Sequence, residues 1–91
     1  MAYYVYILQS KTDNTYYKGF TENPLHRLAQ HNAGEMNYTS KKMPWNMVCL
    51  FVFETKQAAL IFERKIKKYD HARLNSIINS EKNILTIFLK G

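Results

Sequence analysis

The sequence is poor in the residues that cross-link small proteins. It contains one cysteine in 91 residues, so no disulfide can form within the chain and a zinc site of Cys/His type is not assembled. Cys49 lies in the apolar segment 47–53, where a single thiol is typical of a small core residue. No apolar stretch approaches the ~18 residues of a membrane-spanning helix, and no basic region precedes the short apolar N-terminal segment. We therefore expect a cytoplasmic protein that does not enter membranes.

Acidic residues are also scarce. Seven Asp and Glu oppose 13 Lys and Arg, which gives a formal net charge of +6. So much positive charge on a small body favours an anionic partner, and nucleic acid is the partner that we expect, although many small soluble proteins are basic. A hydrophobic content of 46% and a charged content of 22% are ordinary for a folded domain. A chain of this length supports one modest core, so residues 1–91 are predicted to form a single domain.

Aromatic and β-branched residues dominate two segments near the N-terminus. Residues 3–9 and 16–21 are predicted strands, and the polar residues between them, which include Asp13-Asn14, predict a hairpin turn. Because alternate residues of a strand share a face, Tyr4, Tyr6 and Leu8 lie on one side, and Tyr17, Gly19 and Thr21 share a side of the second strand. Residues 47–53 are apolar throughout, which predicts a third strand that is buried on both faces and central to the sheet.

A first helix is predicted to begin at Asn23-Pro24, with the asparagine as cap and the proline at the first helical position. Its expected apolar stripe is Leu25, Leu28 and Ala29, and Gly34 is its expected end. Arg27 and His31 share a face beside this stripe.

Two further helices are expected later in the chain. One covers residues 56–69 and the other covers residues 72–79, while the apolar tail 84–89 packs as a strand or a helical turn. Glu63 falls at the border of the apolar arc of the longer helix. Residues 35–46 are polar and irregular.

Two tyrosines, an arginine, a histidine and a single carboxylate are the parts that a metal-assisted phosphodiester hydrolase needs. Each also has a simpler interpretation. The tyrosines form an aromatic sheet face, the histidines lie on the surface, and Glu63 pairs with Lys67 one helical turn later for ~0.3–0.5 kcal/mol.

A series of blocks occurs in order over residues 3–78: Tyr4-Val5-Tyr6, Tyr17-Lys18-Gly19, Arg27, His31-Asn32-Ala33-Gly34, Thr39 with Pro44-Trp45, and Glu63. This order resembles the GIY-YIG nuclease superfamily, and in particular its small, single-domain bacterial branch. The sequence departs from the name motif at Tyr4, Val5 and Lys18, which are backbone and packing positions, and keeps the tyrosines and Gly19.

The resemblance implies an α+β fold in which a small three-stranded antiparallel sheet is flanked by helices, with a core of about residues 3–78 and a tail of 79–91. It assigns catalytic roles to Tyr6, Tyr17, Arg27, His31 and Glu63. The supporting residues are Gly19, Thr39 and Asn75. Candidate nucleic-acid contacts are Lys18, Lys41, Lys42, Lys67 and Lys68.

The implied activity is metal-dependent endonucleolytic cleavage of DNA with low sequence specificity. Glu63 is the expected ligand of a single Mg²⁺ or Mn²⁺ ion, because one carboxylate does not build a two-metal site. The general base is Tyr6, Tyr17 or His31. The alternatives are a non-catalytic nucleic-acid-binding module on the same scaffold and a basic protein-interaction domain. The sequence predicts no oligomeric state.

Overall fold

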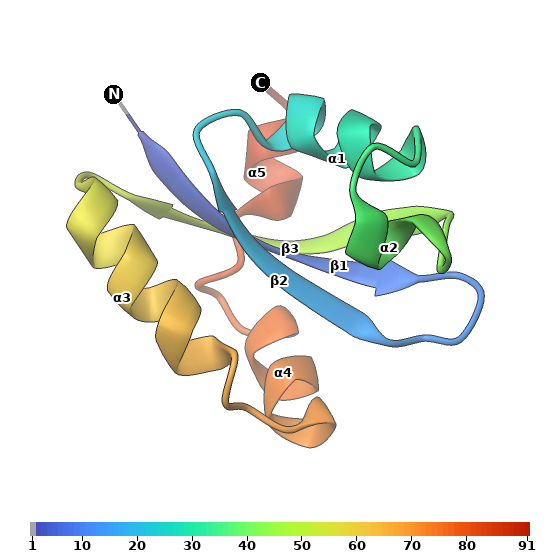
Figure 1. Ribbon diagram of the computed structural model, residues 1–91. Coiled ribbons are helices and arrows are strands. Elements are labelled where there is room, and N and C mark those ends of the chain that lie inside the picture. Colours follow the sequence, from blue (N-terminus) through green and yellow to red (C-terminus); the bar gives the residue numbers. More distant parts are fainter. Residues whose placement is uncertain (1) are drawn as a thin grey trace.

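The computed structural model describes residues 2–91, and its centre is one antiparallel sheet (Figure 1). The strands are β1 (Tyr3–Ser10), β2 (Tyr16–Thr21) and β3 (Trp45–Phe53), in the spatial order β2-β1-β3. The predicted hairpin is confirmed, since β1 pairs with β2 from Tyr4 opposite Thr21 to Gln9 opposite Tyr16.

The prediction that the third strand is central is wrong. β1 occupies the centre, and its residues 5–8 are each at most 1% exposed. β3 is an edge strand whose Val52 is 47% exposed. Its apolar run is explained by the C-terminal segment, which covers part of the outer edge. There, Asn83 Oδ1 accepts from the Leu50 N–H at 3.0 Å, and the Ile84 N–H donates to the Leu50 carbonyl at 2.9 Å.

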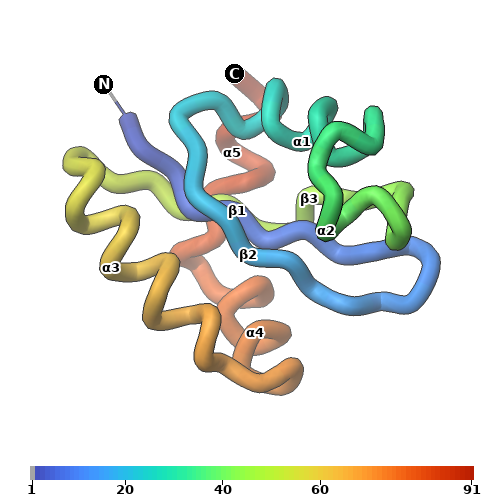
Figure 2. The backbone as a smooth tube through the Cα atoms, in the orientation of Figure 1, coloured from blue at the N-terminus to red at the C-terminus, as the bar shows by residue number. Residues whose placement is uncertain are grey.

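Helices cover both faces of the sheet (Figures 1 and 2). On one face, here called the lower face, lie α3 (Lys56–Ile66) and α4 (His71–Ile78). On the upper face lie α1 (Pro24–Asn32), α2 (Asn37–Ser40) and α5 (Leu85–Leu89). The tail is thus helical, which is one of the two expected alternatives. The segment 35–46, which was expected to be irregular, contains the single turn α2.

Strand alternation divides the core between these layers. Val5 and Ile7 point to the lower face and pack with Ile66 of α3 and Leu74 of α4. Tyr6 and Leu8 point to the upper face. Each layer therefore receives its own set of side chains from the same short strand.

The helix starts follow their capping residues. Asn23 caps α1 as predicted, with its side chain accepting from the His26 N–H at 3.2 Å. Thr55 and Asp70 cap α3 and α4 in the same way. The α3 helix ends at Ile66, short of the predicted Tyr69. Over residues 2–91, the helices are too short and too polar to cross a membrane.

The buried face of α1 differs from the prediction. Leu25 is 51% exposed and His31 is 1% exposed. The interpretation of His31 as a surface residue is therefore wrong. An imidazole can be buried where hydrogen bonds satisfy both of its nitrogens, and His31 meets that condition.

Candidate active site

Gly19 and Tyr6 form the floor of the candidate site. They lie opposite each other in the β1–β2 register. A Cβ atom at position 19 would overlap the tip of the Tyr6 ring and its hydroxyl. The tip of the Tyr6 ring and its hydroxyl therefore lie over β2 at Gly19, the one residue of that strand without a side chain. Gly19 thus leaves the space that the Tyr6 ring occupies.

A buried chain of hydrogen bonds leads from the Tyr6 hydroxyl into the upper layer. Tyr6 Oη is 2.9 Å from His31 Nε2, and His31 Nδ1 is 2.8 Å from Thr39 Oγ1. Thr39 Oγ1 in turn donates to the Met36 carbonyl at 3.4 Å. This last bond sets the direction of the others, because a Thr39 hydroxyl that donates to Met36 accepts from His31 Nδ1–H. His31 Nε2 then accepts from Tyr6.

The ionisation of the two central groups agrees with that direction. Burial raises the pKa of Tyr6 above its ordinary value, and Tyr17 and Glu63 add to the rise while Arg27 opposes it. Burial, with a smaller effect of the Arg27 charge, lowers the pKa of His31. At neutral pH Tyr6 is therefore a phenol that donates, and His31 is a neutral imidazole that accepts. A Tyr6 phenolate as the base disagrees with this raised pKa.

Three other predicted residues lie around the Tyr6 hydroxyl. The Tyr17 ring lies 5.1 Å from the His31 ring and 6.4 Å from the Tyr6 ring, measured between centroids. Arg27 and Glu63 approach closely enough that the charges of both change the pKa of Tyr6. Tyr6, Tyr17 and His31 thus lie in contact beside β2, and Arg27 of α1 and Glu63 of α3 lie near enough for their charges to affect Tyr6; we call this set of five residues the edge cluster.

Glu63 reaches the edge cluster from the opposite layer. Its helix packs on the lower face through Ala59 and Ile66, yet the Glu63 carboxylate acts on the Tyr6 hydroxyl of the upper face. The Glu63 side chain is 14% exposed, which agrees with its predicted border position, and Lys67 Nζ lies 3.5 Å from its Oε2. The expected ion pair is present, and it does not remove Glu63 from the cluster.

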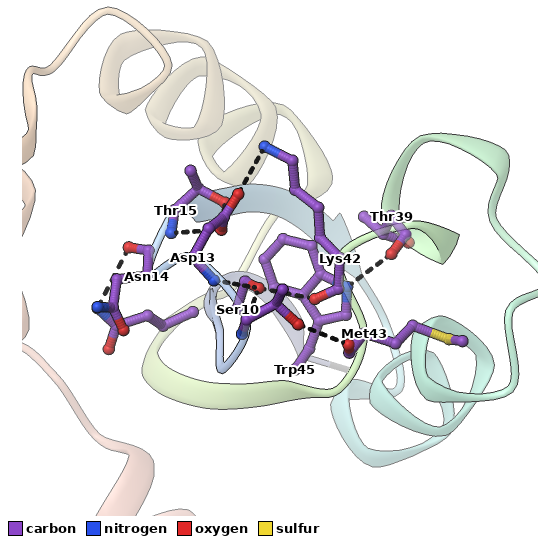
Figure 3. A network of polar contacts seen from close by, with 10 residues as sticks. Ser10, Asp13, Asn14, Thr15, Thr39, Lys42, Met43 and Trp45 are labelled. Carbon is purple, nitrogen blue, oxygen red and sulfur yellow. Dashed lines mark hydrogen bonds and ion pairs between the residues drawn. The ribbon is translucent and has the colours of Figure 1, made fainter.

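The loop that carries Thr39 and Trp45 is fixed to the β1–β2 hairpin (Figure 3). Ser10 Oγ donates to the Lys42 carbonyl at 2.7 Å, and Lys42 Nζ lies 3.2 Å from Asp13 Oδ2. Hydrogen bonds from Thr15, with a smaller effect of Lys42, lower the pKa of Asp13 to about 2. Trp45 Nε1 donates to the Thr39 carbonyl at 2.9 Å. These contacts hold Thr39 where it can accept from His31.

The predicted nucleic-acid residues lie in different surroundings. Lys18 and Lys67 line a hollow of about 250 Å³ beside Tyr17, and burial followed by the charge of Lys67 lowers the pKa of Lys18. Lys42 pairs with Asp13, and Lys41 is exposed on the loop. Lys68 lines a larger groove of about 780 Å³ on α3 and α4. The other basic residues of this groove are Arg64, Lys65, Lys67 and Arg73.

The structure does not bring Asn75 into the edge cluster. It is exposed on α4, and its carbonyl accepts from the Asn79 side chain at 3.0 Å. Two residues beside the cluster were not predicted: Tyr16, whose ring stacks on His71 at 4.5 Å, and Tyr38, whose ring lies 5.8 Å from that of Tyr17. The one sequence feature that could have identified Tyr38 is its position directly before Thr39, a residue of the motif series.

The donors of the edge cluster fit one hard cation. Within residues 2–91 no three His, Cys, Asp or Glu side chains converge on a possible metal position. Both nitrogens of His31 are engaged, which leaves the Glu63 carboxylate as the available anionic ligand. Mg²⁺ suits such a site, since it keeps several waters and binds proteins through one or two carboxylates together with substrate phosphates.

Comparison with known proteins gives the same grouping as the motifs. Residues 2–75 match the family described as the GIY-YIG catalytic domain. A UPF0213 protein of Natronomonas pharaonis is 38% identical over 80 residues, which cover 87% of this chain and 93% of that protein. This archaeal relative extends the resemblance beyond the bacterial branch.

A larger relative and a solved structure are also similar. The structure-specific endonuclease subunit SLX1 of Phaeosphaeria nodorum is 46% identical over 67 residues, which are 67% of this chain but 18% of that protein. The solution structure of a UPF0213 protein from Bacillus halodurans superposes with a TM-score of 0.58 at 28% identity, covering 90% of this chain and 87% of that one. The three-stranded sheet with flanking helices is thus the fold of this group.

Proposed function

The chain belongs to the GIY-YIG family, and on that basis we propose that it is an endonuclease that hydrolyses DNA phosphodiester bonds with one divalent metal ion and little sequence specificity. The observation that carries the proposal is the edge cluster, in which the charges of a glutamate on the lower layer and an arginine on the upper layer both act on the hydroxyl of a hydrogen-bonded tyrosine–histidine pair. A purely structural role for these groups gives no reason for charged side chains of two layers to meet around one hydroxyl.

Glu63 is the proposed ligand of Mg²⁺ or Mn²⁺. When bound, the ion polarises an oxygen of the substrate phosphate and carries water to it. Arg27 provides the positive charge that stabilises the negative charge developing on the phosphate oxygens in the transition state. Lys67 holds the Glu63 carboxylate in place before substrate arrives.

Tyr6 and His31 are the proposed route for the proton of the attacking water. Tyr6 Oη accepts that proton while its own hydrogen passes to His31 Nε2, so the phenolate is never a free species. His31 is the base in this scheme, which suits its neutral resting state. Thr39 keeps the ring oriented by accepting from Nδ1–H. Tyr17 orients the water or the phosphate.

The charge distribution supports a nucleic-acid substrate that is bound through its phosphate backbone. The groove on α3 and α4 and the hollow beside Tyr17 are both lined by basic side chains, and phosphate contacts supply affinity with little sequence information. The similarity to a structure-specific endonuclease subunit of Phaeosphaeria nodorum also supports a nucleic-acid substrate. With about four phosphate contacts, affinity falls roughly 100-fold between 50 and 200 mM salt. A DNA affinity that barely changes between these salt concentrations would contradict recognition through the phosphates and favour a basic protein-interaction domain.

The test is incubation of the pure protein with branched, single-stranded and blunt duplex DNA in Mg²⁺, Mn²⁺ or EDTA. We expect cleavage of at least one form with either metal ion and none in EDTA. Binding without cleavage of any form, in either metal, supports the non-catalytic binding module instead. Cleavage that persists in EDTA contradicts the proposed role of Glu63.

A further inference from the structure

Tyr38 is a large aromatic side chain left in solvent beside the edge cluster. It is 73% exposed, although α2, its helix, is a single turn fixed on both sides by the buried Thr39 and by the loop to β3. Tyrosine presents a large, rigid aromatic face together with a polar tip, a combination that is enriched at binding interfaces. What makes the exposed ring of Tyr38 informative is its position beside the edge cluster.

The ring of Tyr38 continues a line of aromatic groups that starts inside the site. Tyr17 contacts the His31 ring at 5.1 Å and the Tyr38 ring at 5.8 Å, between centroids. Tyr17 and Tyr38 are tilted by 39° to each other, so they do not stack fully and part of the Tyr38 face stays open. The exposed ring of Tyr38 thus contacts Tyr17, a residue with a proposed role in catalysis.

Basic side chains surround the same ring. Tyr38 lines the hollow of about 250 Å³ with Lys18 and Lys67, and a second hollow of about 270 Å³ with Lys42 and His71. An aromatic face flanked by lysines is the combination that binds an unpaired nucleotide, because the base stacks on the ring and the phosphates meet the ammonium groups. A base pair inside a duplex offers no free face to such a ring.

We propose that Tyr38 is the stacking platform for an unpaired nucleobase next to the phosphate that is cleaved, so that the substrate is a nucleic acid with a single-stranded segment at or beside the cut. This inference rests on the proposed function and adds the substrate class to it. Tyr38 contributes its ring, while Lys18 and Lys67 meet the phosphates of the unpaired nucleotide. The phenolic hydroxyl has no part in the stacking.

The experiment measures binding in EDTA, so that it does not depend on catalysis. Wild type, Tyr38→Ala, Tyr38→Leu and Tyr38→Phe are titrated with two DNAs that contain the fluorescent base 2-aminopurine, one with a single-stranded flap and one a blunt duplex. Ile87→Ala is the matched control, since Ile87 is also 73% exposed but lies on α5. Thermal melting of each variant checks that the fold is kept.

We expect Tyr38→Ala to weaken flap binding by about ten-fold, within the roughly 5- to 150-fold range of one lost base–aromatic stack. Duplex binding changes less than about two-fold. Tyr38→Leu behaves like Tyr38→Ala because it lacks an aromatic face, and Tyr38→Phe behaves like wild type. Quenching of the 2-aminopurine emission by wild type and by Tyr38→Phe, and its absence in Tyr38→Ala, reports the stack directly.

Equal losses on flap and duplex, or a Tyr38→Phe variant as weak as Tyr38→Ala, overturn the inference. The stacking inference and the proposed nuclease function can fail independently of each other. A protein that cleaves DNA without any dependence on Tyr38 refutes the platform alone. A protein with Tyr38-dependent flap binding but no cleavage in any metal refutes the nuclease and keeps the platform.

Discussion

The two faces of the sheet are built from the same strand but carry different chemistry. On the lower face, Val5 and Ile7 pack against Ile66 and Leu74, and the buried members of this cluster are all apolar or, in Cys49, a thiol whose pKa burial raises to about 12. On the upper face, Tyr6 lies in a chain of hydrogen bonds with two other buried polar side chains, His31 and Thr39. The buried cluster of the lower face is thus apolar, and the upper face combines apolar packing with a buried polar network.

This difference explains why a polar network is tolerated in so small a protein. Within residues 2–91, every buried side-chain nitrogen and oxygen has a hydrogen-bond partner. An unsatisfied buried group costs about 1–3 kcal/mol, so the network is stable only if it is complete. The apolar lower face, together with the buried Leu8, Trp45 and Leu50 of the upper face, contributes the hydrophobic free energy that offsets the cost of burying this network. We therefore expect variants of the lower face to lose stability, and variants of the edge cluster to lose cleavage.

The largest effect is expected at Glu63. Glu63→Gln removes the one carboxylate of the edge cluster and should abolish cleavage while the fold is retained. Binding to DNA in EDTA should be unchanged or slightly tighter, because a negative charge near the phosphates is lost. Glu54→Gln is the control, because Glu54 is an exposed carboxylate outside the edge cluster and should keep full cleavage. If Glu63 served only to pair with Lys67, Glu63→Gln would lose a few tenths of a kcal/mol of stability and also keep full cleavage.

Arg27→Ala should lower the cleavage rate by about 10²- to 10³-fold, the usual size for the loss of one donor to a developing negative charge. It should also weaken binding in EDTA, which separates it from Glu63→Gln. Arg27→Lys keeps the positive charge but lacks the planar set of donors of arginine. Compared with Arg27→Ala, it should restore DNA binding more fully than the cleavage rate. Unchanged single-turnover cleavage by Arg27→Ala would remove Arg27 from the mechanism.

Ile66→Ala tests the lower face. Ile66 is completely buried, and truncation of such a side chain costs about 2–5 kcal/mol of unfolding free energy. The cleavage rate per folded molecule should stay at the wild-type value. Ile61→Ala, at a position 54% exposed on the same helix, should change stability by less than about 0.5 kcal/mol. A large loss of rate in folded Ile66→Ala protein would mean that the two faces are not separable.

The smallest effect is a pH dependence of stability from His31. Because its pKa is lowered in the folded protein, the unfolded chain takes up a proton near its ordinary value of 6.5 while the folded chain does not. Stability is therefore full above pH 6.5 and falls as the pH decreases below it. Asp13 does not interfere in this range, since its pKa is about 2. Urea unfolding at pH 7.5 and 5.5 should show the loss in wild type and in His26→Gln, but less of it in His31→Gln.

The local patterns predicted most of the fold because they depend on neighbours in sequence. The hairpin, the cap at Asn23 and the buried Cys49 follow from turn chemistry, capping and an apolar run. The strand order could not be predicted in this way. β3 is apolar because Asn83 and Ile84 of the tail cover its edge, and that contact joins residues 33 or more positions apart.

Residue identity predicted the candidate site better than geometry did, although the border position of Glu63 was expected. The motif order named the members of the edge cluster, yet helical periodicity placed His31 beside an apolar stripe on the surface, and the structure buries it. The reason is tertiary: Tyr6 from β1 and Thr39 from α2 supply the two partners of the imidazole. Tyr38 was missed because exposure, its informative property, is not a property of the sequence.

The most direct test of the central claim, that the β2 edge holds one metal ion at Glu63, is a titration of Mn²⁺ into the isotope-labelled protein followed by amide NMR. A paramagnetic ion broadens signals near it. We predict that the amides of Glu63, Gly19 and Tyr6 broaden first, that those of Cys49 and Leu74 in the lower core persist, and that Glu63→Gln removes the selective broadening. Selective broadening around other acids, such as Glu22 or Glu81, with the Glu63 and Gly19 signals unaffected would contradict the account.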